Sequence, residues 1–460
     1  MLLVASTTSD SGKSTIVSAL VRYLNAYPFK AQNMSLNSYP TKDGGEIAFI
    51  QAFQAMASGR EPERGMNAIL LKPSGNGRVE VVHYGTPLGA FSYSEYYETV
   101  LPKLRGSIRL REDMVVEGAG GIEPNFLERD LATVEIMRRG APTILVLNVD
   151  PGGAFTSAYG AYLALPPSLR DRLKGFVINK LRGDPKFLES GVRWLEERTG
   201  MKYLGYLPYS DELSIMPEDS MNLRDFGEGE VEVAVVAYNY VSNFNELWAL
   251  KGSEVSVRFV RSPKQLAKAD LVVLPGAKNT LEAIKWLRER MFEDYLKKKK
   301  LFAVCGGYQV LTRRMTDEYG LEFGSVASVS GLGLIPQEVV YKREKVIAIS
   351  EAKLSNFRLK GYEIRRGRIV GEEFHGEIIK RNGEGLSIPD GYYDGKVFAT
   401  SLHGSLFSEG GKKAFEEMTG VKLAPGSLEE EAEKTAERIV RVMKETVYLD
   451  EIRELWLGVS

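Results

Sequence analysis

The chain has little cysteine and little histidine, and it has no long hydrophobic run. Its 460 residues include one cysteine, Cys305, and three histidines. A single cysteine excludes an internal disulfide and suits a reducing compartment. No apolar stretch has the length that a membrane-spanning helix needs. The formal net charge of −1 gives no general attraction to nucleic acid or anionic lipid, so neither is expected as a partner.

What remains is the composition of an ordinary globular protein. Hydrophobic residues make up 43% of the chain and charged residues 26%. The length allows two or three domains, each with its own core. Residues 1–5 are too short for a signal peptide and lead directly into a motif. We therefore expect a soluble, cytoplasmic protein.

The order of segments along the chain indicates two α/β domains. Short apolar strands alternate with helical patterns, which predicts a parallel sheet covered on both faces. A second such series follows a glycine-rich, acidic stretch at residues 225–230, so we predict domains over 1–228 and 229–460. Residues 427–455 have the pattern of a charged amphipathic helix. The expected strands are 2–5, 114–117, 143–149 and 175–179, then 231–237, 255–260, 270–275 and 301–304.

Cys305 stands where a nucleophile would be exposed. It ends an apolar run and precedes Gly306 and Gly307, after which the pattern becomes helical. The free N–H groups at the start of a helix favour a thiolate and can hold an oxyanion. A lone cysteine is more often a small buried hydrophobic residue. The sharp strand-to-helix turn, with small residues around it, nevertheless predicts a nucleophile elbow.

A phosphate-binding loop is predicted directly after the first strand. Gly12, Lys13 and Ser14 open a helix there, although Thr7 stands where the general motif has a glycine. Backbone N–H groups in such a loop hold phosphates, the lysine reaches the β- and γ-phosphates, and the serine ligates Mg²⁺. The alternative is an incidental Gly-Lys-Ser. The nucleotide-binding candidates are Ser9, Gly12, Lys13, Ser14 and Thr15.

Two further segments are expected near the phosphates. Glu117 ends an apolar strand and is followed by small residues, a position that suits a Mg²⁺ ligand. Residues 28–39 combine asparagines, serines and a lysine on the phosphate-binding side of the sheet. They could form a hydrogen-bonded turn cluster. We favour a role in binding substrate or γ-phosphate, for which the candidates are Lys30, Asn33, Ser35 and Asn37.

The same segment carries a specific family resemblance. Residues 28–38, followed by Gly-Gly-Glu-Ile at 44–47, resemble the cobyric acid synthases, the amidotransferases of cobalamin biosynthesis. The block Gln-Asn-Met-Ser-Leu-Asn at 32–37 separates this family from the cobyrinate a,c-diamide synthases. The resemblance covers nearly the whole chain. Its other motifs lie at 70–75, 117–120, 175–184, 274–280, 305–309 and 402–404.

The resemblance implies a two-domain enzyme. Its N-terminal domain would be similar to dethiobiotin synthetase and use ATP and Mg²⁺, and its C-terminal domain would be a class I glutaminase. Such enzymes amidate the b, d, e and g carboxylates of adenosylcobyrinic acid a,c-diamide, giving adenosylcobyric acid. The expected partners are therefore small molecules: glutamine, ATP and a corrinoid polycarboxylate. Two alternatives stay open, the same chemistry on another polycarboxylate and a nucleotide-binding regulatory module without turnover.

For the glutaminase half, the resemblance implies a role for each motif residue. Cys305 would attack the glutamine amide and form a thioester, and His403 would act as base and acid. Gly276 and Gly306 could supply the oxyanion N–H groups. Many class I triads have a glutamate two residues after the histidine, where this chain has Ser405. No third member is assigned from the sequence.

For the synthetase half, the resemblance implies phosphorylation of the acceptor carboxylate followed by displacement of phosphate by ammonia. Lys13, Lys30 and Mg²⁺ would neutralise the transferred phosphoryl group. By analogy the metal ligands are Ser14, Glu46 and Glu117, and Asp150 joins the substrate and phosphate group. Ammonia must arrive without being protonated by bulk water, which predicts a passage or closed interface between the domains.

Several positions depart from the family pattern, most of them in the synthetase half. The family usually has glycine at the position of Ser6, arginine at that of Phe49 and aspartate at that of Asn148. It usually has arginine at the position of Pro151 and histidine at that of Arg365. The glutaminase motifs are better preserved. Glutamine hydrolysis is therefore better supported by the sequence than the identity of the acceptor.

Overall fold

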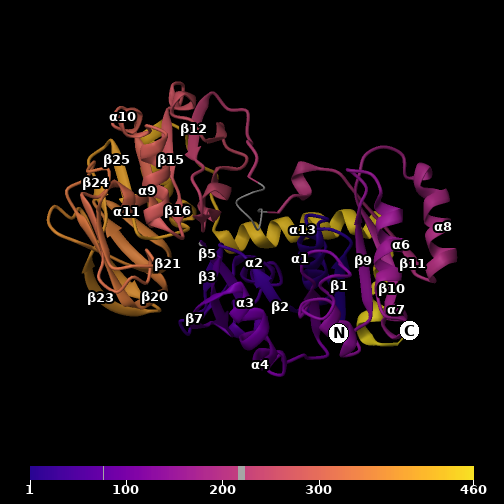
Figure 1. Ribbon diagram of the computed structural model, residues 1–460. Coiled ribbons are helices and arrows are strands. Elements are labelled where there is room, and N and C mark those ends of the chain that lie inside the picture. The colour runs from indigo at the N-terminus through magenta and orange to yellow at the C-terminus, as the bar shows by residue number, and fades with distance from the viewer. Residues whose placement is uncertain (76, 216–222, 460) are drawn as a thin grey trace.

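The computed structural model describes residues 1–75, 77–215 and 223–459, which form two lobes (Figure 1). In the described part of the first lobe, a nine-stranded sheet has the order β11-β10-β9-β1-β8-β2-β5-β6-β7. Neighbouring strands from β11 to β5 are parallel, as predicted, and β6 and β7 are added antiparallel at one edge. The strands are β1 Leu2–Ser6, β2 Tyr27–Met34, β5 Asn67–Gly75, β6 Arg78–His83, β7 Thr86–Ser92, β8 Met114–Glu117, β9 Thr143–Asn148, β10 Leu173–Leu181 and β11 Lys202–Pro208.

Helices cover this sheet and a small hairpin faces the second lobe. Every residue of β1 is buried, because a central parallel strand is covered on both faces and therefore carries a continuous apolar run. The hairpin consists of β3 (Ser38–Pro40) and β4 (Glu46–Ala48). The helices are α1 Lys13–Leu24, α2 Phe49–Ala57, α3 Tyr93–Glu95, α4 Leu101–Arg105, α5 Val134–Arg138, α6 Ala154–Ala164, α7 Pro167–Arg170 and α8 Glu189–Thr199.

The second lobe is built on a six-stranded sheet, in the order β14-β12-β15-β17-β25-β24 within the described residues. All its pairings are parallel except that of β24, so the second α/β domain is also confirmed. The strands are β12 Val231–Val236, β14 Val255–Val260, β15 Leu271–Leu274, β17 Leu301–Val304, β24 Tyr392–Tyr393 and β25 Val397–Thr400, and the helices are α9 Thr280–Glu289, α10 Glu293–Leu296, α11 Gly306–Leu311 and α12 Glu409–Thr419.

A second, largely antiparallel sheet in this lobe shares a hydrophobic core with the six-stranded sheet. Its longest strands, β20 (Glu338–Leu354) and β21 (Phe357–Val370), form a hairpin. A separate short pair, β13 (Val241–Ser242) with β16 (Gly276–Ala277), lies beside α11. The remaining strands are β18 Arg314–Asp317, β19 Ala327–Ser330, β22 Gly376–Arg381 and β23 Glu384–Pro389.

The C-terminal helices return to the first lobe. Helix α13 (Leu428–Thr446) belongs to the predicted amphipathic tail, and in Figure 1 it runs from the junction of the lobes along the first lobe, where it contacts α1, α2 and β11. Its Ile439 and Met443 are fully buried in a core shared with α1 and β1. Helix α14 (Leu449–Leu457) follows, and the Trp456 indole donates to the Met114 carbonyl at 3.2 Å. The predicted boundary near residue 228 stays a prediction, but these helices complete the N-terminal domain.

The two lobes also share apolar packing. The rings of Tyr39 and Tyr362 lie 4.8 Å apart across the interface. Phe49, one of the positions that departs from the family, packs against Tyr39 and Phe53 in the same buried cluster. The phenylalanine therefore serves packing here.

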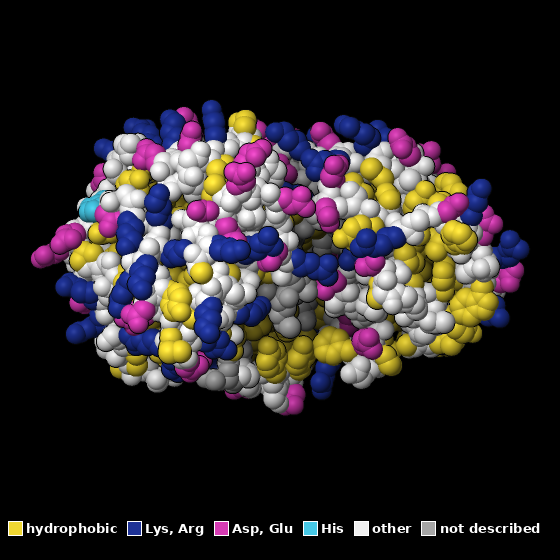
Figure 2. Space-filling model, turned by 90° about the horizontal axis from the view of Figure 1, so that it is seen from above, with side chains coloured by type: hydrophobic (Ala, Val, Ile, Leu, Met, Phe, Trp, Pro, Cys, Tyr) yellow, Lys and Arg dark blue, Asp and Glu magenta, His cyan; other side chains and the backbone are white. Residues whose placement is uncertain are grey.

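The surface agrees with the balanced composition. On the face seen in Figure 2, basic and acidic side chains are interspersed over both lobes. Among the described residues, no helix combines the length and the apolar character needed to cross a membrane.

Candidate functional site

Cys305 lies at a strained turn between β17 and α11. Its φ of 48° and ψ of −103° are rare for a residue with a side chain. The two glycines that follow are required sterically, because a Cβ on Gly306 would lie 2.4 Å from the Ala277 nitrogen and one on Gly307 1.9 Å from the Leu274 oxygen. This is the strand, turn and helix that the sequence predicts.

His403 follows β25 and lies next to Cys305. The imidazole is 1% exposed, stacks on Tyr362, and has Nδ1 3.1 Å from the Asn243 carbonyl oxygen. Burial alone would lower the pKa of His403. The charge of Cys305 and its hydrogen bond to the ring, together with Glu246, outweigh burial and raise that pKa to about 10. The pair is therefore suited to a thiolate and an imidazolium.

The two glycines predicted for the oxyanion site flank this pair. A Cβ on Gly276 would lie 2.6 Å from Cε1 of His403, so that position accepts no side chain. Gly306 directly follows Cys305 at the start of α11. The structure thus brings Cys305, His403, Gly276 and Gly306 together.

A cavity extends from Cys305 and His403 to the first lobe. Near the pair it is lined by Gln309 and Tyr341, and at the domain interface by Lys278, Lys345 and Lys72. Lys72 belongs to β5 of the first lobe, whereas the other four belong to the second. The cavity therefore has walls from both domains.

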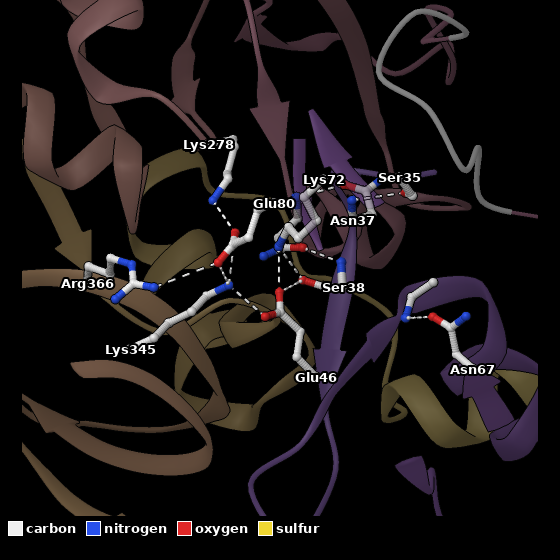
Figure 3. Close-up of polar contacts among 12 residues, drawn as sticks. Ser35, Asn37, Ser38, Glu46, Asn67, Lys72, Glu80, Lys278, Lys345 and Arg366 are labelled. Atoms are coloured by element: carbon white, nitrogen blue, oxygen red, sulfur yellow. Dashed lines mark hydrogen bonds and ion pairs between the residues drawn. The ribbon is translucent and has the colours of Figure 1, made fainter. Parts of the chain in front are cut away.

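A buried set of charges lies at the end of this cavity (Figure 3). We call Glu46, Glu80, Lys72, Lys278 and Lys345 the interdomain ion cluster. Lys345 Nζ lies 2.6 Å from Glu46 and 3.2 Å from Glu80. Lys72 Nζ lies 2.6 Å from Glu46, and Lys278 Nζ lies 2.5 Å from Glu80. Both carboxylates come from the first lobe, and Lys278 and Lys345 come from the second.

Burial and pairing shift the titration of this cluster. Burial would raise the pKa of Glu46, but the ammonium groups of Lys345 and Lys72 bring it down to about 2. Burial lowers the pKa of Lys72 to about 8, against the opposing effect of Glu46. Glu46, predicted as a metal ligand, has its carboxylate in this cluster, whereas the carboxylate of Glu117 pairs with Ser14 and Lys30.

The predicted phosphate-binding loop precedes α1. Gly12 has a left-handed φ of 92° and packs against Asn179, whose side chain donates to the Ser11 carbonyl at 2.8 Å. The buried Lys13 Nζ donates to Ser6 Oγ at 2.7 Å and to the Gly120 carbonyl at 2.8 Å. Ser6, a departure from the family, is thus bonded into the loop. Ser9 is exposed at the loop surface, and Thr15 lies in the first turn of the helix.

Ser14, Lys30 and Glu117 meet at the C-terminal edge of the sheet. Glu117 Oε1 accepts from Ser14 Oγ at 3.0 Å and from Lys30 Nζ at 2.9 Å. Gln54, which the sequence did not single out, donates to the other oxygen of Glu117. A serine hydroxyl and one carboxylate beside a phosphate loop fit Mg²⁺, which takes few protein ligands and completes its shell with phosphates and water.

The other predicted substrate residues lie in different places. The Asn33 side chain donates to Gln51 at 3.2 Å, inside the first lobe. Ser35 Oγ accepts from the Asn37 backbone N–H at 3.0 Å. Asn37 itself reaches across the interface, where its side chain accepts from the Asn243 backbone N–H at 2.7 Å.

Asp150 lies on the surface beside two departures from the family. It pairs with Arg182 at 2.7 Å, and its backbone N–H donates to the Asn148 side chain at 3.0 Å. Nothing in the structure explains Pro151. In the second lobe, Arg365 pairs with Glu363 at 2.6 Å and lines the cavity with Cys305. The guanidinium thus stabilises the cavity wall where a histidine is usual.

Two residues at the site have no sequence signal that could have found them. Glu246 is fully buried behind His403, with Oε1 3.8 Å from Nδ1. Asn243 has a positive φ of 49° and contacts both His403 and the first lobe. Both follow β13 and are far from Cys305 in the chain, Asn243 in the connecting loop and Glu246 on a short 3-10 helix.

Comparison with known proteins gives matches in both lobes. Residues 2–223 match the CobQ/CobB/MinD/ParA nucleotide binding domain, and residues 232–411 match the CobB/CobQ-like glutamine amidotransferase domain. The cobyric acid synthase of Streptomyces coelicolor is 37% identical, over 90% of this chain and 86% of its own. The probable cobyric acid synthase of Thermococcus gammatolerans is 34% identical, over 98% of each chain. A cobyric acid synthase from Streptococcus sanguinis is 37% identical, over 88% of this chain and 86% of its own.

Proposed function

Since the chain belongs to the cobyric acid synthase family and is an amidotransferase, we propose that it converts adenosylcobyrinic acid a,c-diamide to adenosylcobyric acid with glutamine and MgATP. The b, d, e and g carboxylates would become carboxamides in turn. One observation carries the proposal: a single cavity has Cys305 and His403 at one end and Lys72 of the nucleotide-binding lobe at the other.

The glutaminase step follows from the geometry of the Cys305 pair. The thiolate of Cys305 attacks the carbonyl carbon of the glutamine side-chain amide, and N–H groups of Gly276 and Gly306 hold the oxyanion. The C–N bond then breaks, and His403 gives its proton to the departing nitrogen. This leaves a thioester and ammonia, and water attacks the thioester to release glutamate.

The synthetase step uses the loop at the start of α1. Lys13 and Lys30 would neutralise the β- and γ-phosphates of ATP while the substrate carboxylate attacks the γ-phosphorus. Ser14 and Glu117 would hold Mg²⁺, which supplies charge neutralisation at the phosphates. Ammonia then displaces phosphate from the activated carboxylate. Phosphate is an easier leaving group than hydroxide.

We propose that ammonia passes the interdomain ion cluster on its way from Cys305 to the synthetase site. The cavity that contains Cys305 ends at Lys72, Lys278 and Lys345. The cluster holds three ammonium groups against two carboxylates, and its surplus positive charge disfavours ammonium and favours neutral ammonia, the form that can attack an acyl phosphate. The paired side chains are at most 15% exposed, which supports the closed interface that the chemistry needs.

The test is glutamine-dependent amidation followed by mass spectrometry of the corrinoid. We expect stepwise conversion of carboxylates to carboxamides with MgATP and glutamine. Cys305→Ala should abolish the reaction with glutamine and retain it with ammonium chloride, because only the ammonia source is lost. A corrinoid left unchanged by wild-type protein with either nitrogen source would contradict the proposal.

An unchanged corrinoid would favour a different acceptor. Asn148 and Pro151 depart from the family in the synthetase half, so another polycarboxylate is the second candidate. Glutamate release and ATP hydrolysis that require a different carboxylate would support it. ATP binding with no hydrolysis in the presence of any acceptor would instead support the regulatory alternative.

A further inference from the structure

Glu246 is a buried carboxylate directly behind His403. It lies on a short 3-10 helix, Asn245–Leu250, and none of its surface is exposed. Oε2 accepts a long hydrogen bond from the Gly404 backbone N–H at 3.4 Å. Oε1 lies 3.8 Å from His403 Nδ1 and has no hydrogen-bond partner among the described residues. Since an unpaired buried carboxylate is costly, its charge needs a cation nearby.

The position two residues after the histidine cannot supply a negative charge to His403. Ser405 stands where a glutamate completes many triads, and its buried hydroxyl has no partner within the described chain. The 3-10 helix that carries Ser405, Ser405–Phe407, packs against the one that carries Glu246. The negative charge beside His403 is therefore supplied by Glu246 on the neighbouring 3-10 helix, Asn245–Leu250.

We propose that Glu246 is the positioning residue of the Cys305–His403 pair, holding the imidazolium in place by its charge. The role rests on the proposed function, and it concerns only the glutaminase half. Glu246 is absent from the lining of the Cys305 cavity, so it acts through His403 and does not touch glutamine.

The contacts of His403 assign a role to each ring nitrogen. Nδ1–H donates to the Asn243 carbonyl, which fixes the tautomer and leaves Nε2 to exchange a proton with Cys305. When Nε2 is protonated, the ring carries a positive charge that Glu246 stabilises. The other described groups that act on this pair are the ring of Tyr362, which stacks on the imidazole, the neutral phenols of Tyr238 and Tyr341, and the guanidinium of Arg365, which shares the cavity with Cys305.

The variant Glu246→Gln separates charge from shape. It keeps the size and the acceptor for Gly404, and it removes the negative charge. We expect glutamate release to fall about 10- to 100-fold in kcat, with the KM for glutamine little changed. Glu246→Asp restores a carboxylate and should recover part of the rate.

Titration of the histidine gives a readout that simple packing would not move. Glu246 raises the pKa of His403, so its removal should shift the imidazole titration and the basic limb of the glutaminase profile to lower pH. With three histidines in the chain, carbon-13 labelled imidazole signals can be assigned by single His→Gln variants of His83 and His375.

The outcomes decide between the inference and the function on which it rests. Wild-type kcat and an unmoved His403 titration in Glu246→Gln would overturn the inference. So would a loss of rate without any shift of the titration, because that result assigns Glu246 a packing role. Glutamate release that survives in Cys305→Ala would instead overturn the proposed glutaminase site.

Discussion

The side chain of Asn37 accepts a hydrogen bond from the backbone N–H of Asn243 at 2.7 Å, across the domain interface and directly behind His403. A second hydrogen bond joins the same two segments: the side chain of Asn243 accepts from the Ser38 backbone N–H at 2.7 Å. The carbonyl of Asn243 faces Nδ1 of His403. One residue therefore connects the loop of the nucleotide-binding lobe with the imidazole.

Removing this connection should weaken glutamine hydrolysis. We expect Asn37→Ala to lower glutamate release several-fold, because a hydrogen bond worth about 1 kcal/mol that orients Asn243 is lost. The measurement is glutamate formation at saturating glutamine. A matched control is Asn382→Ala, which removes an asparagine that accepts from the Ile349 N–H within one lobe. Equal losses in both variants would argue against a special role for Asn37.

The interdomain ion cluster should determine how well the two activities are coupled. Lys345→Met leaves Glu46 paired only with Lys72 of its own lobe, while Glu80 keeps Lys278 and, at 3.8 Å, Arg366. Glu46 thereby loses its ion pair across the interface, so we expect the domain interface to loosen. Ammonia would then escape, and more glutamate should form per carboxamide. The ratio of the two products, measured in one reaction, tests this.

A surface variant provides the comparison for the coupling experiment. Lys297→Met breaks an exposed pair with Glu293 in the same lobe and should leave the product ratio unchanged. If Lys345→Met keeps the wild-type ratio, the cluster has no part in retaining ammonia.

The carboxylate of Glu363 should make the free energy of unfolding depend on pH in the acid range. Burial would raise its pKa, but Arg365 and Arg381 bring it down to about 2. Because the pKa is lower in the folded state than in the unfolded chain, the stabilisation is complete above the unfolded value, about 4.5, and is lost as pH falls towards 2.

The variant Glu363→Gln tests this dependence. It removes the nearer of the two carboxylates that pair with the buried Arg365, the other being Asp390 at 3.8 Å, so we expect a loss of roughly 1.5–3 kcal/mol at neutral pH. The difference from wild type should shrink as pH falls through that window, as measured by urea denaturation. A difference that stays constant down to the acid end would contradict the assignment.

The elbow glycine should be intolerant of any side chain. A Cβ on Gly307 would lie 1.9 Å from the Leu274 carbonyl oxygen, a contact that requires the backbone to move. We expect Gly307→Ala to abolish glutamine-dependent activity and to retain the ammonia-dependent reaction. Gly385→Ala, where a Cβ meets nothing within 4 Å, is the control and should keep both activities.

Much of this arrangement could be predicted from the sequence because its signals are local. The buried parallel strands have continuous apolar runs, and Cys305 and Lys13 each lie where a strand turns into a helix. Such a signal depends on neighbours in the chain. Local signals predicted the two parallel sheets and the residues at the two turns.

The rest depends on contacts between distant segments. The sequence offers a carboxylate at Glu46 but does not tell which cation it faces, and the fold turns it towards Lys72 and Lys345. Glu246 lies 157 residues before His403 and has no spacing rule to connect them. Similarly, the amphipathic pattern of α13 predicts a helix but does not identify the domain that it covers.

The position of helix α13 determines the order in which the two domains can be completed. During synthesis the chain leaves the ribosome from its N-terminus, so the apolar face of α1 emerges long before α13 exists to cover it. The first domain can be finished only after the second has been made. Nascent chains halted before residue 428 should therefore hold an unfinished N-terminal domain that binds chaperones, and release of the full chain should end that binding.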